Sequence, residues 1–156
     1  MRKFLLGFTL LIVMAACSDA DSKDTYTIED AKENGDVIVE HGARNFDQIV
    51  AGEIDVQNAG KVLELIESKE EAEVEISIFE QDGTHYKNTL STDGEGFTFE
   101  NNYGGYPQSP TGTFSCKYMS ERGPVIYMGS CTSDDGTEVS TMIGMVGSEE
   151  AFRQGS

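Results

Sequence analysis

Residues 73–91 read EVEISIFEQDGTHYKNTLS and carry the clearest secondary-structure signal in the chain. Val74, Ile76 and Ile78 alternate with polar residues, which is the period of a β-strand with one buried face. The Asp-Gly pair at 82–83 is typical of a hairpin turn, and the residues that follow it return as a second strand. The stretch therefore predicts an antiparallel β-hairpin.

More strand patterns lie on the C-terminal side of this hairpin. We expect them at residues 96–100, 113–119, 125–131 and 137–146. In the first strand of the later hairpin, Phe114, Cys116 and Tyr118 are expected to share one face. The loop that precedes this hairpin carries Tyr103 and Tyr106 among glycines and prolines.

Helical patterns lie on the N-terminal side. Thr27 and Asp30 have the spacing of a capping box, and Asn45 has the features of a second N-cap. Apolar residues within 59–69 follow the 3.6-residue period of a helix. Because helices come first and antiparallel strands follow, we predict an α+β fold. We expect an antiparallel sheet of about five to six strands, with two or three N-terminal helices packed on one face.

The chain begins with the layout of a secretory signal. Arg2 and Lys3 precede an uncharged run of thirteen residues, from Phe4 to Ala16. This run is shorter than the roughly 20 residues that a transmembrane helix needs. We therefore predict that residues 1–16 are a signal peptide.

Residues 14–17 read Met-Ala-Ala-Cys and resemble the lipobox of bacterial lipoproteins, with Met in place of the usual Leu. The alternative is an ordinary secretory signal followed by an incidental cysteine. We predict cleavage before Cys17 and attachment of fatty acyl chains such as palmitate, two or more of which anchor a protein stably. The anchor would lie in the cell membrane of a Gram-positive host or the outer membrane of a Gram-negative one.

After the signal peptide we expect a tether, one domain and a tail. Residues 17–26 are polar and predict a flexible tether. A single globular domain is expected over 27–147 and a disordered tail over 148–156.

Two cysteines remain once Cys17 is assigned to lipid. Cys116 and Cys131 lie nearly opposite each other in the predicted hairpin. Export places them in an oxidising compartment, where disulfides persist. We predict that they form a disulfide that contributes about 3 kcal/mol to stability.

The chain is strongly acidic, with a formal net charge of −17. Removal of residues 1–16 takes away Arg2 and Lys3 but no acidic residue, which leaves −19. Such a charge argues against nucleic acid as a partner and against flat binding to anionic lipid. It suits solubility, a basic partner or divalent cations, and a solvated acidic surface is the simplest interpretation.

The string Asn-Gly-Asp-Val-Ile at 34–38, followed by His-Gly at 41–42, Asn-Phe at 45–46 and two late cysteines, resembles an uncharacterised family of small bacterial lipoproteins. This family is a domain of unknown function found largely in Bacillus-type bacteria. The resemblance covers roughly residues 27–131, with extra residues here around 52–58 and a more acidic composition. It implies a lipid-anchored envelope protein and supplies no activity and no catalytic residues.

Motifs for chemistry are few. The chain has two histidines, so a zinc site of three or four ligands is not expected, nor is any cofactor. No nucleophile elbow and no phosphate-binding loop occur in the sequence. His41 lies at a predicted strand end just before Asn45, where backbone N–H groups can bind an anion. The alternative is a histidine that only hydrogen-bonds the turn.

Tyr103 and Tyr106 are the second candidate for binding. Tyrosines in a loop can present amphipathic faces to a partner. The alternative is that both fold onto the sheet.

These features favour a non-catalytic, lipid-anchored envelope protein that binds another protein or an envelope component. One alternative is an enzyme that acts on cell-wall or extracellular substrate, with His41 or His85 as its base. Another is an inhibitor of a basic enzyme, which the charge indicates.

Overall fold

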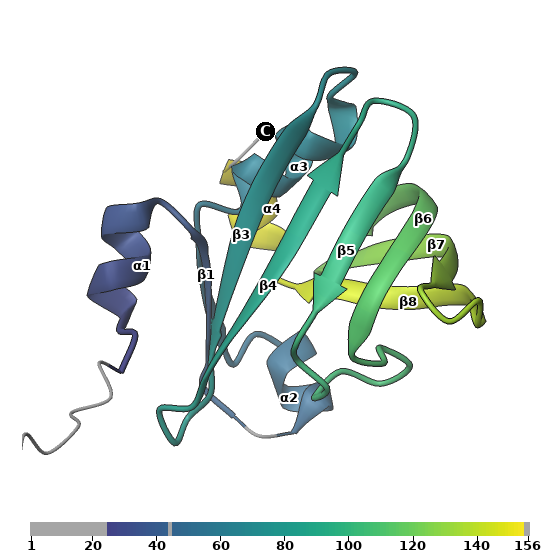
Figure 1. Cartoon of the computed structure of the whole chain (residues 1–156). Coiled ribbons are helices and arrows are strands. Elements are labelled where there is room, and N and C mark those ends of the chain that lie inside the picture. Colours follow the sequence, from purple (N-terminus) through teal and green to yellow (C-terminus); the bar gives the residue numbers. More distant parts are fainter. Residues whose placement is uncertain (1–24, 44, 155–156) are drawn as a thin grey trace, which may run out of the picture.

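The computed structural model describes residues 25–43 and 45–154. Its main feature is one eight-stranded sheet that curls into a half-barrel (Figure 1). The strand order is β2-β1-β3-β4-β5-β6-β7-β8. The strands are β1 Val37–His41, β2 Ile54–Gln57, β3 Ala72–Phe79, β4 His85–Thr92, β5 Phe97–Asn101, β6 Gly112–Arg122, β7 Val125–Ser133 and β8 Glu138–Val146.

The sheet is mixed. The hairpin that the sequence predicts at 73–91 forms β3 and β4, and the strands after it continue as an antiparallel meander. β1 pairs with β3 in parallel, with Val37 opposite Ile76. β2 then pairs with β1 in the antiparallel sense and forms one edge of the sheet.

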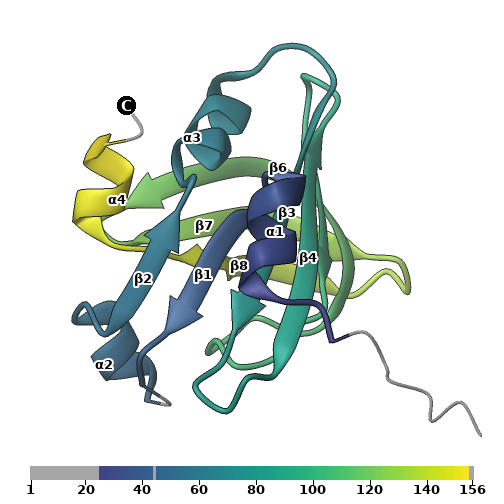
Figure 2. The same cartoon turned by 90° about the vertical axis from the view of Figure 1, so that its left-hand side faces the viewer.

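Four short helices accompany the sheet: α1 Ile28–Asn34, α2 Phe46–Val50, α3 Gly60–Glu67 and α4 Glu149–Gln154. The capping box of Thr27 and Asp30 at α1 is confirmed. α1 lies apart from the other three helices in Figure 1, and Figure 2, turned by 90°, shows it in front of the strands. None of the helices within the described ranges is long and apolar enough to cross a membrane.

The helices divide between two apolar clusters. The main core lies inside the curl and includes Val62 and Leu65 of α3 and Ile49 of α2. A smaller cluster joins Ala31 of α1 to strand residues, Phe79 among them, on the other face of the sheet. The curled strands therefore form most of the wall around the main core.

The predicted α+β fold is wrong, because the protein is a mostly-β fold with 46% strand and 20% helix. Two causes explain the error. The residues that form β2 were not predicted as a strand, and the short β1 gives no sign in sequence that it joins β3 in parallel. The helices, of five to eight residues, do not form a layer on one face. The sheet closes over the core by curling instead.

The C-terminal residues also differ from expectation. Where a disordered tail was predicted from residue 148, Glu149–Gln154 forms α4. Phe152 of this helix is buried in the main core. A single aromatic residue in a short polar segment is a weak sequence signal, which explains the difference.

The inward–outward alternation of side chains shifts by one residue across β6, β7 and β8. Lys117 and Tyr118 are both exposed in β6, with buried residues on either side. Ser140 and Thr141 are both exposed in β8. Between these strands, Ser130 of β7 has a left-handed backbone conformation, with φ 52°. The expectation that Tyr118 shares a face with Cys116 is therefore wrong.

Candidate functional site

His41, Tyr103 and Tyr106, which the sequence singled out separately, lie together in the structure. His41 ends β1, and both tyrosines belong to the loop between β5 and β6. The Tyr106 hydroxyl is 3.0 Å from His41 Nε2, and the Tyr103 hydroxyl is 3.3 Å from His41 Nδ1. The Tyr103 hydroxyl also donates to Glu80 at 3.1 Å. We call these four residues the His41 cluster.

The hydrogen-bond partners determine which atoms of the His41 cluster carry a proton. Tyr103 has one hydroxyl proton, and it is directed to the carboxylate of Glu80. His41 Nδ1 must therefore carry a proton and donate to the Tyr103 oxygen. Nε2 is then the acceptor, and Tyr106 donates to it. This arrangement requires a neutral imidazole.

Burial also favours the neutral forms of His41, Tyr103 and Tyr106, through their pKa values. Desolvation lowers the pKa of His41 from its ordinary value of 6.5 to about 4. Burial also raises the pKa of Tyr103 and Tyr106 above that of a free tyrosine, and the hydrogen bond to Glu80 adds to the shift of Tyr103. The imidazole of His41 and the two tyrosine hydroxyls are thus held in their neutral forms over the physiological pH range.

The two tyrosines are not exposed for recognition. Each keeps only 4% of its surface accessible. Their loop is held down by the side-chain amide of Asn101, which donates to Ser109 and Pro110. The Ser109 hydroxyl donates to the carbonyl of Ile143 in β8 at 2.6 Å. The loop therefore folds onto the sheet, which is the alternative that the sequence left open.

Asn45 serves as a helix cap. Its side-chain oxygen accepts a hydrogen bond from the backbone of Asp47 at 2.8 Å, at the start of α2. An open hollow of about 450 Å³ lies beside His41, and the acidic residues Glu40, Glu53 and Asp55 line it. Negative charge at this hollow argues against the anion site that we considered for His41 and Asn45.

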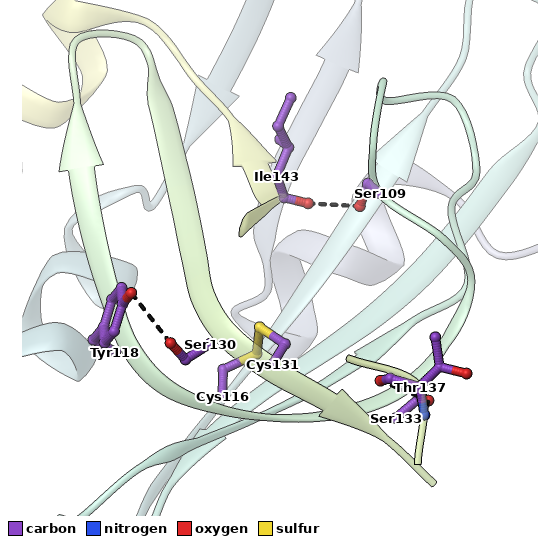
Figure 3. Close-up of a disulfide and its surroundings, with 8 residues drawn as sticks. All are labelled: Ser109, Cys116, Tyr118, Ser130, Cys131, Ser133, Thr137 and Ile143. Atoms are coloured by element: carbon purple, nitrogen blue, oxygen red, sulfur yellow. Dashed lines mark hydrogen bonds between the residues drawn. A yellow bond between two sulfur atoms is a disulfide. The ribbon is translucent and has the colours of Figure 1, made fainter. Parts of the chain in front are cut away.

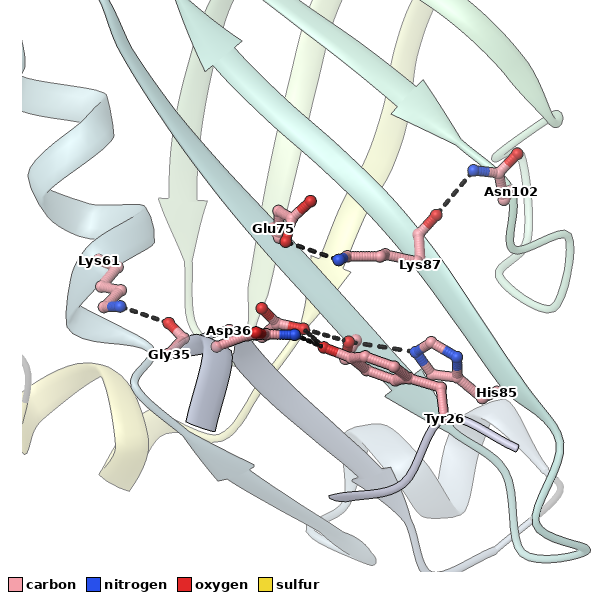
Figure 4. A network of polar contacts seen from close by, with 10 residues as sticks. Tyr26, Gly35, Asp36, Lys61, Glu75, His85, Lys87 and Asn102 are labelled. Atoms are coloured by element: carbon pink, nitrogen blue, oxygen red, sulfur yellow. Dashed lines mark hydrogen bonds and ion pairs between the residues drawn. The ribbon is translucent and has the colours of Figure 1, made fainter. Parts of the chain in front are cut away.

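The second histidine, His85, belongs to a polar network around Asp36 (Figure 4). The buried carboxylate of Asp36 accepts from the Tyr26 hydroxyl at 2.8 Å and from the Ser77 hydroxyl at 2.6 Å. His85 Nε2 lies 3.1 Å from the same Ser77 oxygen. The His85 ring stacks between Tyr26 and Phe79, at centroid distances of 4.6 and 4.7 Å. The network therefore fixes Tyr26, which lies just before the N-cap of α1, to the sheet.

The group to which the Ser77 hydroxyl donates its proton decides whether Ser77 can act as a nucleophile. An activated serine gives its proton to a histidine. Here the Ser77 proton goes to Asp36, so His85 Nε2 must donate to the serine oxygen. Ser77 is also fully buried. Serine, histidine and aspartate are adjacent here, but their order suits a structural bond network and not a nucleophile.

Desolvation is the main cause that lowers the pKa of His85, and the nearby charge of Lys87 acts in the same direction. Asp36 opposes the shift. Lys87 itself forms an ion pair with Glu75 at 2.6 Å, and this hydrogen bond raises the pKa of Lys87. His85 is thus favoured as a neutral donor.

The predicted disulfide is confirmed. Cys116 and Cys131 are register partners in β6 and β7, and their sulfurs are 2.06 Å apart (Figure 3). The predicted lipid attachment residue, Cys17, lies outside the described residues, as does the signal peptide. Over residues 25–43 and 45–154, His, Cys, Asp and Glu side chains do not gather in any group of three that could hold a metal ion.

Three polar residues of the His41 cluster and the Asp36 network carry little signal in the sequence. Asp36 stands before a β-branched run, Ser77 sits on the polar side of an alternating strand, and Glu80 precedes a turn. Each is ordinary in its local context. Their partners come from other elements, as with His41 and Tyr106, which are 65 residues apart.

No family model, curated protein or solved structure matches this chain.

Proposed function

We propose that this protein is a lipid-anchored component of a bacterial envelope, and that its domain binds an envelope component without catalysing a reaction. The signal peptide and lipobox pattern ending at Cys17 support the anchor. The resemblance to small lipoproteins supports the same compartment.

One observation carries the non-catalytic part of the proposal. The two histidines, which would be the bases of an enzyme, are bonded within the His41 cluster and the Asp36 network. In the described part of the chain, buried side-chain nitrogen and oxygen atoms all have hydrogen-bond partners. Catalytic groups need a substrate within hydrogen-bond reach. These groups instead reach one another, which supports a rigid scaffold that acts through its surface.

The anchor is tested by replacing Cys17 with Ala and growing cells with labelled palmitate. The unchanged chain should incorporate the label and sediment with membranes, and Cys17→Ala should do neither. A chain with Cys116→Ala and Cys131→Ala is the matched control, because it lacks the other two cysteines but keeps the lipidation residue. Label that persists in Cys17→Ala would refute the anchor.

The binding role is tested by crosslinking the anchored protein in intact cells and isolating what it captures. A specific envelope component should be recovered, and recovery should survive His41→Gln and His85→Gln. Turnover of an envelope substrate that either substitution abolishes would instead establish the enzyme alternative. Capture of one basic protein that salt releases would favour the inhibitor alternative.

A further inference from the structure

Tyr118 stands out on the surface of β6. Its side chain is 53% exposed, and it is the only large hydrophobic residue among the described ones that is strongly exposed to solvent. Tyrosine is enriched at binding interfaces because it combines an apolar ring with a hydroxyl group. The alternation shifts in β6 itself, where Lys117 and Tyr118 both face solvent, so the exposure of Tyr118 follows from the backbone of its own strand.

The ring of Tyr118 is held in place. It lies directly over Gly129, its register partner in β7, and a Cβ atom at Gly129 would clash with the ring. The Ser130 hydroxyl donates to the Tyr118 hydroxyl at 3.2 Å (Figure 3). The disulfide crosslinks the same two strands two residues away. A ring fixed in this way loses little conformational entropy when a ligand binds.

A hollow lies beside the residues that flank this ring, Lys117 in the chain and Ser130 across the sheet. Its volume is about 440 Å³, and Ser130, the partner of Tyr118, is among its lining residues. The lining also includes Lys117, Thr132, Glu138 and Ser140. Within the described residues, these four side chains have neither a hydrogen-bond nor an ion-pair partner. We call Tyr118 and the hollow together the Tyr118 patch.

The polar surface continues beyond the Tyr118 patch. Thr132 pairs across the sheet with Ser115, which lines a second hollow of about 510 Å³. Thr98 and Ser91 continue this row of register partners onto β5 and β4. Neighbouring strands are about 4.8 Å apart, so the row offers hydroxyl groups at regular intervals. An extended polar ligand could therefore contact several strands.

The chemistry of the patch indicates the ligand class. Protein interfaces bury a core of several apolar side chains, whereas Tyr118 is a single ring surrounded by hydroxyl groups. A sugar ring has C–H groups that pack on an aromatic face and hydroxyls that exchange hydrogen bonds with Ser, Thr, Lys and Glu. The net charge of −17 disfavours anionic polymers.

From these observations we infer that the Tyr118 patch binds a neutral saccharide chain, with one sugar ring stacked on Tyr118 and its hydroxyls bonded to the hollow. This inference rests on the proposed binding function and names its ligand class. Tyr118 supplies the apolar contact, and the side chains of Lys117, Thr132, Glu138 and Ser140 supply the polar ones.

The test is a titration of the exported chain carrying Cys17→Ala with N-acetylchitotetraose and with cellotetraose, followed by NMR of the tyrosine rings. The Tyr118 ring signals should shift and saturate with at least one of these probes. Tyr118→Ala should weaken binding by about tenfold or more, and Tyr118→Phe, which keeps the ring face, by no more than about threefold. Glu33→Ala, at an exposed position on α1 outside the Tyr118 patch, is the control and should bind as the parent does.

Thermal unfolding of each variant checks that the fold is intact. If neither probe shifts the Tyr118 signals at millimolar concentration, or if Tyr118→Ala binds as well as its parent, the inference is overturned. Crosslinking in cells separates this failure from failure of the proposed function. Tyr118-dependent capture of a protein, without saccharide binding, would overturn the saccharide alone, whereas no capture of any component would remove the binding function as well.

Discussion

At the scale of single residues, burial is the main cause that favours the neutral form of both histidines. His41 keeps 5% of its surface accessible and contacts two tyrosine hydroxyls. A proton added to His41 Nε2 would remove the acceptor to which the Tyr106 hydroxyl donates. Folding is therefore coupled to the protonation of this residue.

We predict that His41 makes the free energy of unfolding depend on pH in the range between its pKa in the folded protein and its pKa in the unfolded chain. The pKa is about 4 in the folded protein and about 6.5 in the unfolded chain, so the unfolded chain binds a proton first as pH falls. The contribution is fully present above pH 6.5 and is lost as pH falls toward 4, by about 2 to 3 kcal/mol in total. Urea unfolding of the parent at pH 7.5 and pH 4.5 should show this loss.

His41→Gln is the comparison for this prediction, because glutamine can donate to one tyrosine and accept from the other. It should be less stable than the parent at pH 7.5 but should lose less stability at pH 4.5. His85 and all carboxyl groups are common to both proteins, so their contributions cancel. An equal pH dependence in both proteins would mean that His41 is already free to titrate in the folded state.

At the scale of elements, two turns of the meander have the same residue type and backbone but different surroundings. Gly83 follows β3 with φ 85°, and Gly94 follows β4 with φ 87°. A Cβ atom at Gly83 would meet open space, whereas one at Gly94 would clash with the backbone carbonyl of Lys69. The second turn therefore packs against the segment that leads from α3 into β3.

We predict that Gly94→Ala lowers the free energy of unfolding more than Gly83→Ala does. Both substitutions carry the cost of a left-handed backbone, about 1 kcal/mol. Gly94→Ala must also displace backbone, which should add about 1 to 2 kcal/mol. Urea unfolding of the two variants gives the comparison, and equal losses would show that the Lys69 segment yields freely.

The β6–β7 pair is expected to depend on its crosslink. The disulfide joins residues separated by 15 positions, and its loss should lower the free energy of unfolding by about 3 kcal/mol. A variant with Cys116→Ala and Cys131→Ala should show this loss, and a reducing agent should then have no further effect on it. If reduction leaves the parent as stable as before, the crosslink contributes nothing to folding.

At the scale of the whole molecule, repulsion between like charges should dominate the response to salt. The net charge is −17, and among the described residues Lys87 and Glu75 form the one ion pair. Salt screens both the repulsion between like charges and the attraction within ion pairs, but in this protein the repulsion between acidic groups is far larger. We predict that the thermal midpoint rises by several degrees between about 10 mM and 500 mM sodium chloride. A midpoint that falls would indicate that attractive pairs matter more.

The sequence was a good guide to features that are local and a poor one to features that are not. The hairpin at 73–91, the cap at Thr27 and the opposed cysteines depend on residues close in the chain or on a regular register, and all three were predicted. The parallel pairing of β1 with β3 leaves no periodic signal. The contacts of His41 with Tyr103 and Tyr106 depend on how a loop returns across the curl, which spacing along the chain does not encode.

The change of phase at the level of Ser130 limits where residues can be inserted or deleted in β6, β7 and β8. Tyr118, Gly129 and Thr141 are register partners on three adjacent strands, and all three strands change phase at this level. A one-residue deletion in β6 alone would turn its following side chains out of phase with those of β7 and β8, and would carry Met119 from the core into water. Insertions and deletions here must therefore be matched on neighbouring strands, so that β6, β7 and β8 still change phase at the same level.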